Sequence, residues 1–231
     1  MLQRRHHVVL LGDSIFANAA YTSGGPDVAT HLRQLAADWD VTLLAEDGAT
    51  IRGVPAQLAR LPADATHLVI SAGGNDALQN GDLLTFTASS SVEVLQAFAA
   101  RLAVFERAYR TVIAEAASAG RPVVVCTVYN GALDAARAVA ARVGLAVFND
   151  AILRAAIDLR LDTLELRSIC TEPSDYANPI EPSVQGGRKI AHAIAVAVGA
   201  IETPARPARI WGSPSAAGDV AAGAGAAACR S

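Results

Sequence analysis

Residues 8–14 read Val-Val-Leu-Leu-Gly-Asp-Ser, and this stretch decides the fold. Four consecutive apolar residues before a glycine indicate a short strand that is buried on both faces, as in a parallel sheet. Gly12 permits a tight turn, so Ser14 is expected where the strand gives way to a loop or helix. In open α/β sheets ligands bind at that carboxyl edge. Taken alone, Gly-Asp-Ser fits an ordinary turn with an N-capping serine better than a site.

The chain up to residue 201 alternates strand and helix patterns. Apolar runs predict further strands at 41–45, 66–72, 123–128 and 163–167. Helical spacing predicts helices at 28–38, 54–61, 92–119, 134–159 and 186–201. The pattern at 145–148 suits a helix or a strand. Alternating strands and helices predict a three-layer α/β/α sandwich around a five-stranded parallel sheet, and right-handed crossovers favour the flavodoxin-like order 2-1-3-4-5.

Composition divides the chain into two parts. With 231 residues, 52% of them hydrophobic, the chain is long enough for one α/β domain, which we expect over 1–202. Residues 203–231 are rich in Pro, Ala and Gly and cannot build a packed face, so they are predicted to form a mobile tail, from which Trp211 could still dock on the surface.

Charge and cysteine usage narrow the class of protein. The net charge is −3 without any block of like charges, which gives no reason to expect nucleic acid as a partner. The start of the chain does not fit a signal sequence, and no run approaches the roughly 18 apolar residues of a membrane span. Cys126, Cys170 and Cys229 are scattered without metal-ligand spacing. We therefore expect reduced thiols in a cytoplasmic protein, with Cys126 in the core.

Residues that suit acyl transfer follow three of the predicted strands. Ser14 follows the first strand, Gly48 the second, and Asn75 lies in the Gly-Gly-Asn-Asp run after the third. If these strands are neighbours, the backbone N–H groups of Ser14 and Gly48 and the Asn75 side-chain amide converge on one point. Such donors form an oxyanion hole, each worth about 2.7–4 kcal/mol to a tetrahedral transition state.

Three motifs carry a family resemblance. Gly12-Asp13-Ser14, Asp47-Gly48-Ala49-Thr50 and Gly73-Gly74-Asn75-Asp76 resemble the first three motif blocks of the SGNH/GDSL hydrolases, and the resemblance spans 7–201. It implies that Ser14 is the nucleophile and that Gly48 and Asn75 complete the oxyanion hole. It also implies cleavage of esters, thioesters or acetyl groups of lipids and sugars without a metal or other cofactor. Turn chemistry accounts for the glycines of these blocks but not for Asn75.

The fourth block departs from the family pattern. In the family, an Asp and, three residues later, the His that activates the serine lie in the last loop. Here Asn178 stands at the Asp position and Glu181 at the His position. Glu181 is therefore the best available base, provided that burial raises its pKa from about 4.3 toward 6–7. Asn178 could orient the carboxylate through its amide. Alternatively, Glu181 only places a charge at the N-terminus of the last helix.

Position argues against four of the five histidines as a substitute base and leaves His31 open. His6, His7 and His67 lie before or at the start of strands, at the opposite end of the sheet from Ser14. His192 is about 200° around the last helix from the core-facing Ile190, so it should face outward. His31 is interpreted as a solvated helix residue.

The sequence thus predicts a serine hydrolase that acts on a small-molecule acyl ester. Asp13, expected to fix the turn, is also expected to line the substrate site, with Asp76 and Tyr176. The carboxylates match no metal-site spacing, so no metal is expected. Because the fourth block lacks His, the alternative is an inactive or weak module that binds an acylated or carbohydrate ligand. Neither the substrate nor the oligomeric state can be read from the sequence.

Overall fold

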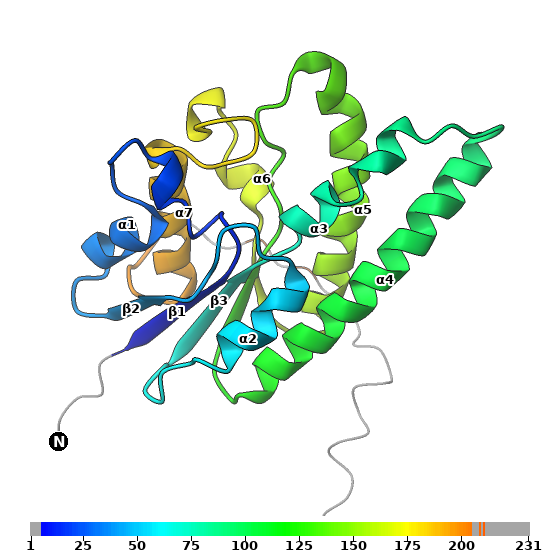
Figure 1. The fold of residues 1–231 in the computed structure, drawn as a ribbon. Coiled ribbons are helices and arrows are strands. Elements are labelled where there is room, and N and C mark those ends of the chain that lie inside the picture. The colour runs from blue at the N-terminus through cyan, green and yellow to red at the C-terminus, as the bar shows by residue number, and fades with distance from the viewer. Residues whose placement is uncertain (1–5, 205–207, 209, 211–231) are drawn as a thin grey trace, which may run out of the picture.

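The fold is a parallel sheet between two layers of helices (Figure 1). The computed structural model describes residues 6–204, 208 and 210. The sheet consists of β1 (His7–Gly12), β2 (Asp40–Leu43), β3 (His67–Ser71), β4 (Val123–Cys126) and β5 (Asp162–Leu164). Every pairing is parallel and the order is β2-β1-β3-β4-β5. The predicted fold class and strand order are confirmed.

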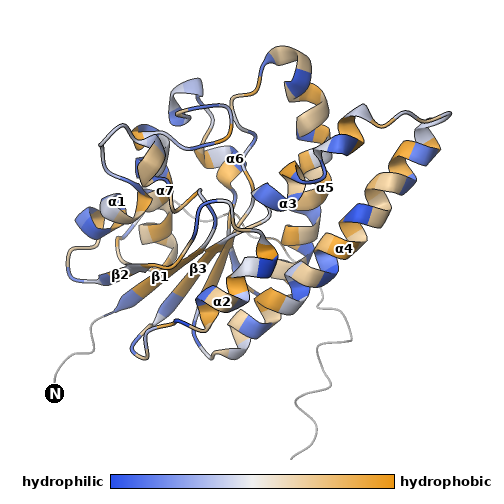
Figure 2. Cartoon of the chain, viewed as in Figure 1, coloured by the Kyte–Doolittle hydropathy of each residue, from blue (hydrophilic) through white to orange (hydrophobic). Residues whose placement is uncertain are grey.

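The sheet is buried on both faces because its central strands are apolar on both. Val9 and Leu11 of β1 pack into one core with α2 (Val54–Leu58), α4 (Ser91–Ser118) and α5 (Ala135–Leu159). Val8 and Leu10 pack into the other with α1 (Val28–Leu35), α6 (Leu166–Ile169) and α7 (Val184–Ala197). The short α3 (Gly74–Leu78) follows β3. Figure 2 shows apolar and polar residues alternating along α4, as amphipathic packing requires.

Single-turn 3-10 helices lie in the connecting loops. They are η1 (Ala19–Tyr21), η2 (Ile51–Gly53), η3 (Gly81–Thr85) and η4 (Pro173–Asp175). The first two lie in the loops that leave β1 and β2, η3 lies between α3 and α4, and η4 precedes α7.

Some local predictions need correction. The fifth strand ends at Leu164, because the Glu165 side chain accepts the Arg167 N–H and starts the α6 turn instead. Of the two alternatives for residues 145–148, the helix is the correct one: they belong to α5, which runs unbroken through Gly144. His31 is buried rather than solvated, because α1 packs against α7 and the His31 Nε2 donates to the Val184 carbonyl at 3.1 Å.

The predicted tail falls almost entirely outside the described residues, as do Trp211 and Cys229. Cys126 is buried in the core, as expected, and both it and Cys170 are free thiols. Within the described residues, no helix combines the length and the hydropathy that crossing a membrane requires.

Candidate active site

Gly12 places Ser14 at the carboxyl edge of the sheet. Its φ is +124°, and a Cβ there would lie 1.7 Å from the Ser71 carbonyl oxygen, so only glycine fits between β1 and β3. The Gln57 side chain holds Gly12 by accepting its N–H at 2.7 Å and donating to its carbonyl at 2.9 Å. The Asp13 N–H donates to Ser71 O at 3.0 Å. This buried cradle determines where the next residue, Ser14, projects.

Ser14 is hydrogen-bonded to Glu181. Its Oγ donates to Glu181 Oε1 at 3.1 Å, across 167 positions of sequence. Both residues are buried, with 7% and 5% of their surface exposed. The other carboxylate oxygen, Oε2, is buried without a hydrogen-bond partner among the described residues. Burial raises the pKa of Glu181 above its usual 4.5, the Ser14 bond lowers it in part, and the Asp47 charge raises it. Glu181 is therefore more basic than an exposed glutamate.

The loop that carries Glu181 is fixed by its own backbone contacts. Asn178 Oδ1 accepts the N–H groups of Ile180 and Glu181, each at 2.9 Å. The expected bond from the Asn178 amide to the Glu181 carboxylate is not formed, since that carboxylate's bond is to Ser14. Nor does Glu181 cap the last helix, because the Ser183 hydroxyl accepts the Gly186 N–H there. Asn178 thus positions the backbone of Glu181 rather than its side chain.

Asn75 joins two of the predicted motif loops. Its Nδ2 donates to the carbonyl of Ala49, the residue after Gly48, at 3.0 Å. That amide has a second N–H, and Asn75 lines the same cavity as Ser14. Gly48 has a φ of +77° and does not line this cavity. Among the described residues, the backbone N–H groups of Ser14 and Gly48 have no protein acceptor.

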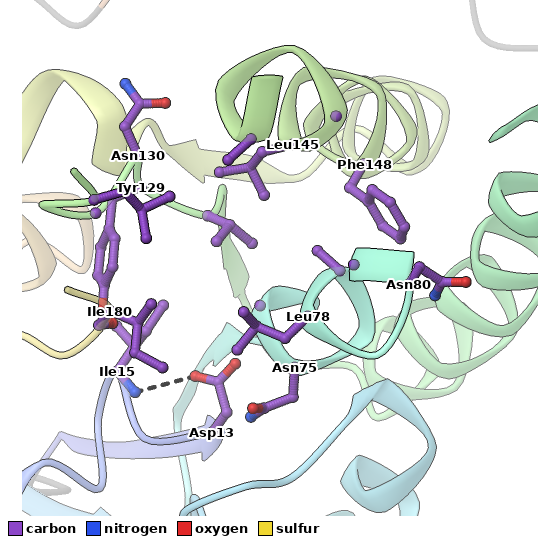
Figure 3. Close-up of a pocket in the computed structure, with 18 of the residues that line it drawn as sticks. Asp13, Ile15, Asn75, Leu78, Asn80, Tyr129, Asn130, Leu145, Phe148 and Ile180 are labelled. Carbon is purple, nitrogen blue, oxygen red and sulfur yellow. Dashed lines mark hydrogen bonds between the residues drawn. The ribbon is translucent and has the colours of Figure 1, made fainter. Parts of the chain in front are cut away.

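Of the three predicted substrate-binding residues, only Asp13 lines the Ser14 cavity. Asp13 lines the Ser14 cavity, and its Oδ1 accepts the Ile15 N–H at 3.1 Å (Figure 3). Asp76 does not line it; its Oδ2 accepts the Ile51 N–H at 2.9 Å and so holds the loop after β2. Tyr176 does not line it either, because its hydroxyl is directed to the Cys170 carbonyl, 2.8 Å away. The expected substrate contacts of Asp76 and Tyr176 are therefore not supported.

Tyr129 is one of the lining residues that sequence reasoning missed, and it lies beside Glu181. It follows β4, its ring packs edge-on against Tyr176 with 5.2 Å between centroids, and its hydroxyl donates to the Ile180 carbonyl at 2.6 Å. It thereby braces the residue next to Glu181. The available signal was its place after the fourth strand, because ligands gather at the carboxyl ends of parallel strands.

Asp13 is the most strongly perturbed carboxyl of the cavity. Burial raises its pKa from 3.8 to about 8; the Ile15 N–H bond lowers it, and the nearby charges of Glu181 and Asp76 raise it. Asp13 is therefore largely protonated at neutral pH, which keeps a second negative charge away from Glu181. The described residues contain no cluster of three or more His, Cys, Asp or Glu that could hold a metal ion.

The family of the chain follows from these motifs and from comparison with known proteins. The model of the GDSL-like lipase/acylhydrolase family matches residues 10–189. The chain belongs to this family. A comparison by sequence with curated proteins gives no match.

Solved structures resemble this GDSL-family chain in fold. An extracellular lipase from Streptomyces rimosus is 18% identical, with a TM-score of 0.61 over 83% of this chain and 99% of that one. A phospholipase A1 from Streptomyces albidoflavus NA297 is 18% identical, with a TM-score of 0.59 over 82% and 99%. An acetylxylan esterase from Geobacillus stearothermophilus is 16% identical, with a TM-score of 0.61 over 84% and 94%. At such identities the likeness concerns the fold alone.

In this GDSL-family chain the motif serine is paired with a carboxylate. Among the described histidines, His7 binds Thr42, His31 binds the Val184 carbonyl and His67 binds Thr66; none is hydrogen-bonded to Ser14. Within the described part of the chain, Glu181 is thus the titratable group in direct contact with the Ser14 hydroxyl.

Proposed function

We propose that the protein is a carboxylic-ester hydrolase that works through an acyl-enzyme on Ser14, with Glu181 as the general base. The observation that carries this proposal is the 3.1 Å hydrogen bond from Ser14 Oγ to Glu181 Oε1. The family supports ester hydrolysis in general, and structural neighbours are described as a lipase, a phospholipase and an acetylxylan esterase. The raised pKa of Glu181 brings its basicity closer to what a general base needs.

The reaction takes two steps through the same groups. Ser14 Oγ attacks the ester carbonyl carbon while its proton passes to Glu181. The tetrahedral intermediate then collapses, the carbon–oxygen bond to the alcohol breaks, and Glu181 returns the proton to the leaving oxygen. Water next attacks the acyl-enzyme and gives a proton to Glu181. Collapse of the second intermediate releases the carboxylic acid, and the proton returns to Ser14.

Charge that develops on the carbonyl oxygen needs donors. The best candidate donors are the backbone N–H of Ser14 and the second N–H of the Asn75 amide, because both residues line the cavity that also contains Glu181. The Gly48 N–H, close to Asn75 through the Ala49 contact, is the third candidate donor. Losing one such donor costs about 10²–10³ in kcat in a well-studied protease.

The deciding experiment compares the wild type with Glu181→Gln and Ser14→Ala on p-nitrophenyl acetate. Gln keeps an oxygen to accept the Ser14 bond but cannot take its proton, so kcat should fall by about 10²–10⁴. The matched control is Glu202→Gln, the same change at an exposed position. The wild-type kcat/KM should rise with pH through an ionisation above 4.5, because Glu181 acts as a base only when deprotonated.

Glu181→His restores the residue of the family pattern. Its activity distinguishes the hypothesis of an active hydrolase from that of an inactive binding module. If Glu181 is the base, this variant should retain activity with its pH profile moved toward the imidazole range near about 6.5. Unchanged kcat in Glu181→Gln would place the base elsewhere, and activity that survives Ser14→Ala would remove the nucleophile. Turnover only in the His variant would favour the inactive binding module instead.

A further inference from the structure

The Ser14 cavity has a polar end and an apolar end. It is about 160 Å³ in volume. The polar end comprises the catalytic candidates at the carboxyl edge of the sheet. The apolar end is built by α3, η3, α4, α5 and the loop before α5, and its larger members are Leu78, Leu84, Phe98, Leu133, Leu145 and Phe148. Figure 3 shows Leu145 and Phe148 across the cavity from Asp13 and Asn75.

The apolar end is incompletely covered by protein. Leu78 and Leu84 keep 54% and 45% of their surface exposed although they line the cavity. Deeper in, Phe148 and Val128 are buried, with 3% and 7% exposed. An apolar group that entered from the Ser14 side would remove the exposed leucine surface from water, which is favourable in proportion to the area covered.

We propose that this cavity is the acyl site and that it selects apolar acyl chains of about six carbons. The proposal rests on the proposed role of Ser14 and adds the substrate class. A dry apolar cavity of about 150 Å³ in another protein holds a benzene molecule, which has six carbons. The cavity here is of similar volume. Acetyl groups leave most of it empty, and chains well beyond six carbons extend past the buried residues.

The cavity is assigned to the acyl group rather than to the alcohol. The alcohol must depart after the first step, whereas the acyl group stays bonded to Ser14 through both steps. A site that ends on buried side chains such as Phe148 and Val128 suits the group that stays. The leaving oxygen has to take its proton from Glu181, next to the exposed Ile180, where the alcohol can leave to solvent.

Gly144 and Phe98 set the depth of the site. A Cβ on Gly144 would lie 3.4 Å from the Phe98 ring and 3.6 Å from a Leu84 methyl, which is ordinary contact distance. A larger side chain on Gly144 would therefore occupy the space of the last carbons of the chain. Truncating Phe98, a half-buried wall residue, would lengthen that space.

The test measures kcat/KM for p-nitrophenyl esters with acyl chains from two to twelve carbons. Each methylene that leaves water should raise kcat/KM about fourfold, so hexanoyl should exceed acetyl by about 10²-fold, without a further rise at longer chains. Gly144→Leu should reduce that hexanoyl preference at least about tenfold. Phe98→Ala should move the optimum to longer chains. Ala146→Leu, on the exposed face of the same helix, is the matched control. It should change neither the hexanoyl preference nor the optimal chain length.

Binding to Ser14→Ala separates this proposal from the proposed catalytic role. Calorimetry should show that this variant binds ethyl hexanoate more tightly than ethyl acetate, and that adding Gly144→Leu removes the difference. If no ester is hydrolysed but this binding holds, the catalytic role fails and the site assignment stands. Two results would overturn the assignment. One is a kcat/KM that does not change with acyl-chain length. The other is a preference for hexyl acetate over ethyl acetate as large as the preference for the hexanoyl over the acetyl ester. Opposite shifts in Gly144→Leu and Phe98→Ala cannot come from general destabilisation.

Discussion

Asp13→Asn should make the protein's stability less dependent on pH. The Asp13 carboxyl is fully buried beside Ser14, and its pKa is raised from 3.8 to about 8, chiefly by that burial. Between these two values the folded state keeps a proton that the unfolded state has lost. The free energy of unfolding therefore falls as pH rises through this window. Asn keeps an oxygen to accept the Ile15 N–H but carries no proton to lose.

The size of the effect follows from the pKa difference. At about 1.36 kcal/mol for each pKa unit, Asp13 alone removes about 4 kcal/mol of stability between pH 5 and pH 9. The stability of Asp13→Asn relative to the wild type should therefore increase by about 4 kcal/mol over that range. Other titrating groups are common to both proteins and cancel in the difference to a first approximation.

Urea unfolding at pH 5, 7 and 9 measures this difference. Asp38→Asn makes the same chemical change at an exposed position and serves as the control. A stability difference between Asp13→Asn and the wild type that does not vary with pH would show that Asp13 titrates normally in the folded state. A difference that shrinks as pH rises would show that the folded state stabilises the ionised carboxylate, and would refute the reasoning from burial.

Two further substitutions test the scaffold around Ser14 and the cavity. Gln57→Ala leaves the buried N–H and carbonyl of Gly12 without their side-chain partner, so the free energy of unfolding should fall by about 2–3 kcal/mol in urea titrations, with kcat lowered as Ser14 loses its support. A loss below about 0.5 kcal/mol would mean that water replaces both contacts. Asn149→Ala removes the paired bonds to Val128 N and O, at 2.7 and 2.8 Å, and should destabilise by a similar amount in the same assay. If its melting temperature matched the wild type, the loop after β4 would not depend on Asn149.

Local pattern determined the sheet and the place of the nucleophile candidate. The apolar run at 8–11 requires burial on both faces, and only a sheet covered by helices on both sides provides it. Crossover handedness then limits the strand order, which brings Ser14 and Asn75 to one edge. The resemblance of the fourth block to the family pattern singled out Glu181, whose side chain does contact Ser14. These inferences depend on residues close in sequence, on rules of chain connection or, for Glu181, on the family resemblance.

Only the tertiary structure decided the directions of side chains that bridge distant segments. His31 is buried because α1 meets α7, 153 positions away, and nothing in its own helix pattern shows that partner. The Tyr176 hydroxyl is directed to the Cys170 carbonyl, and Tyr129 rather than Tyr176 lines the Ser14 cavity. The apolar end of the cavity is lined jointly by residues of α3, η3, α4 and α5, and Gly144 of α5 leaves space there beside the Phe98 ring of α4. A one-dimensional pattern records which face of an element is apolar, whereas a cavity depends on the volumes that several elements leave between them.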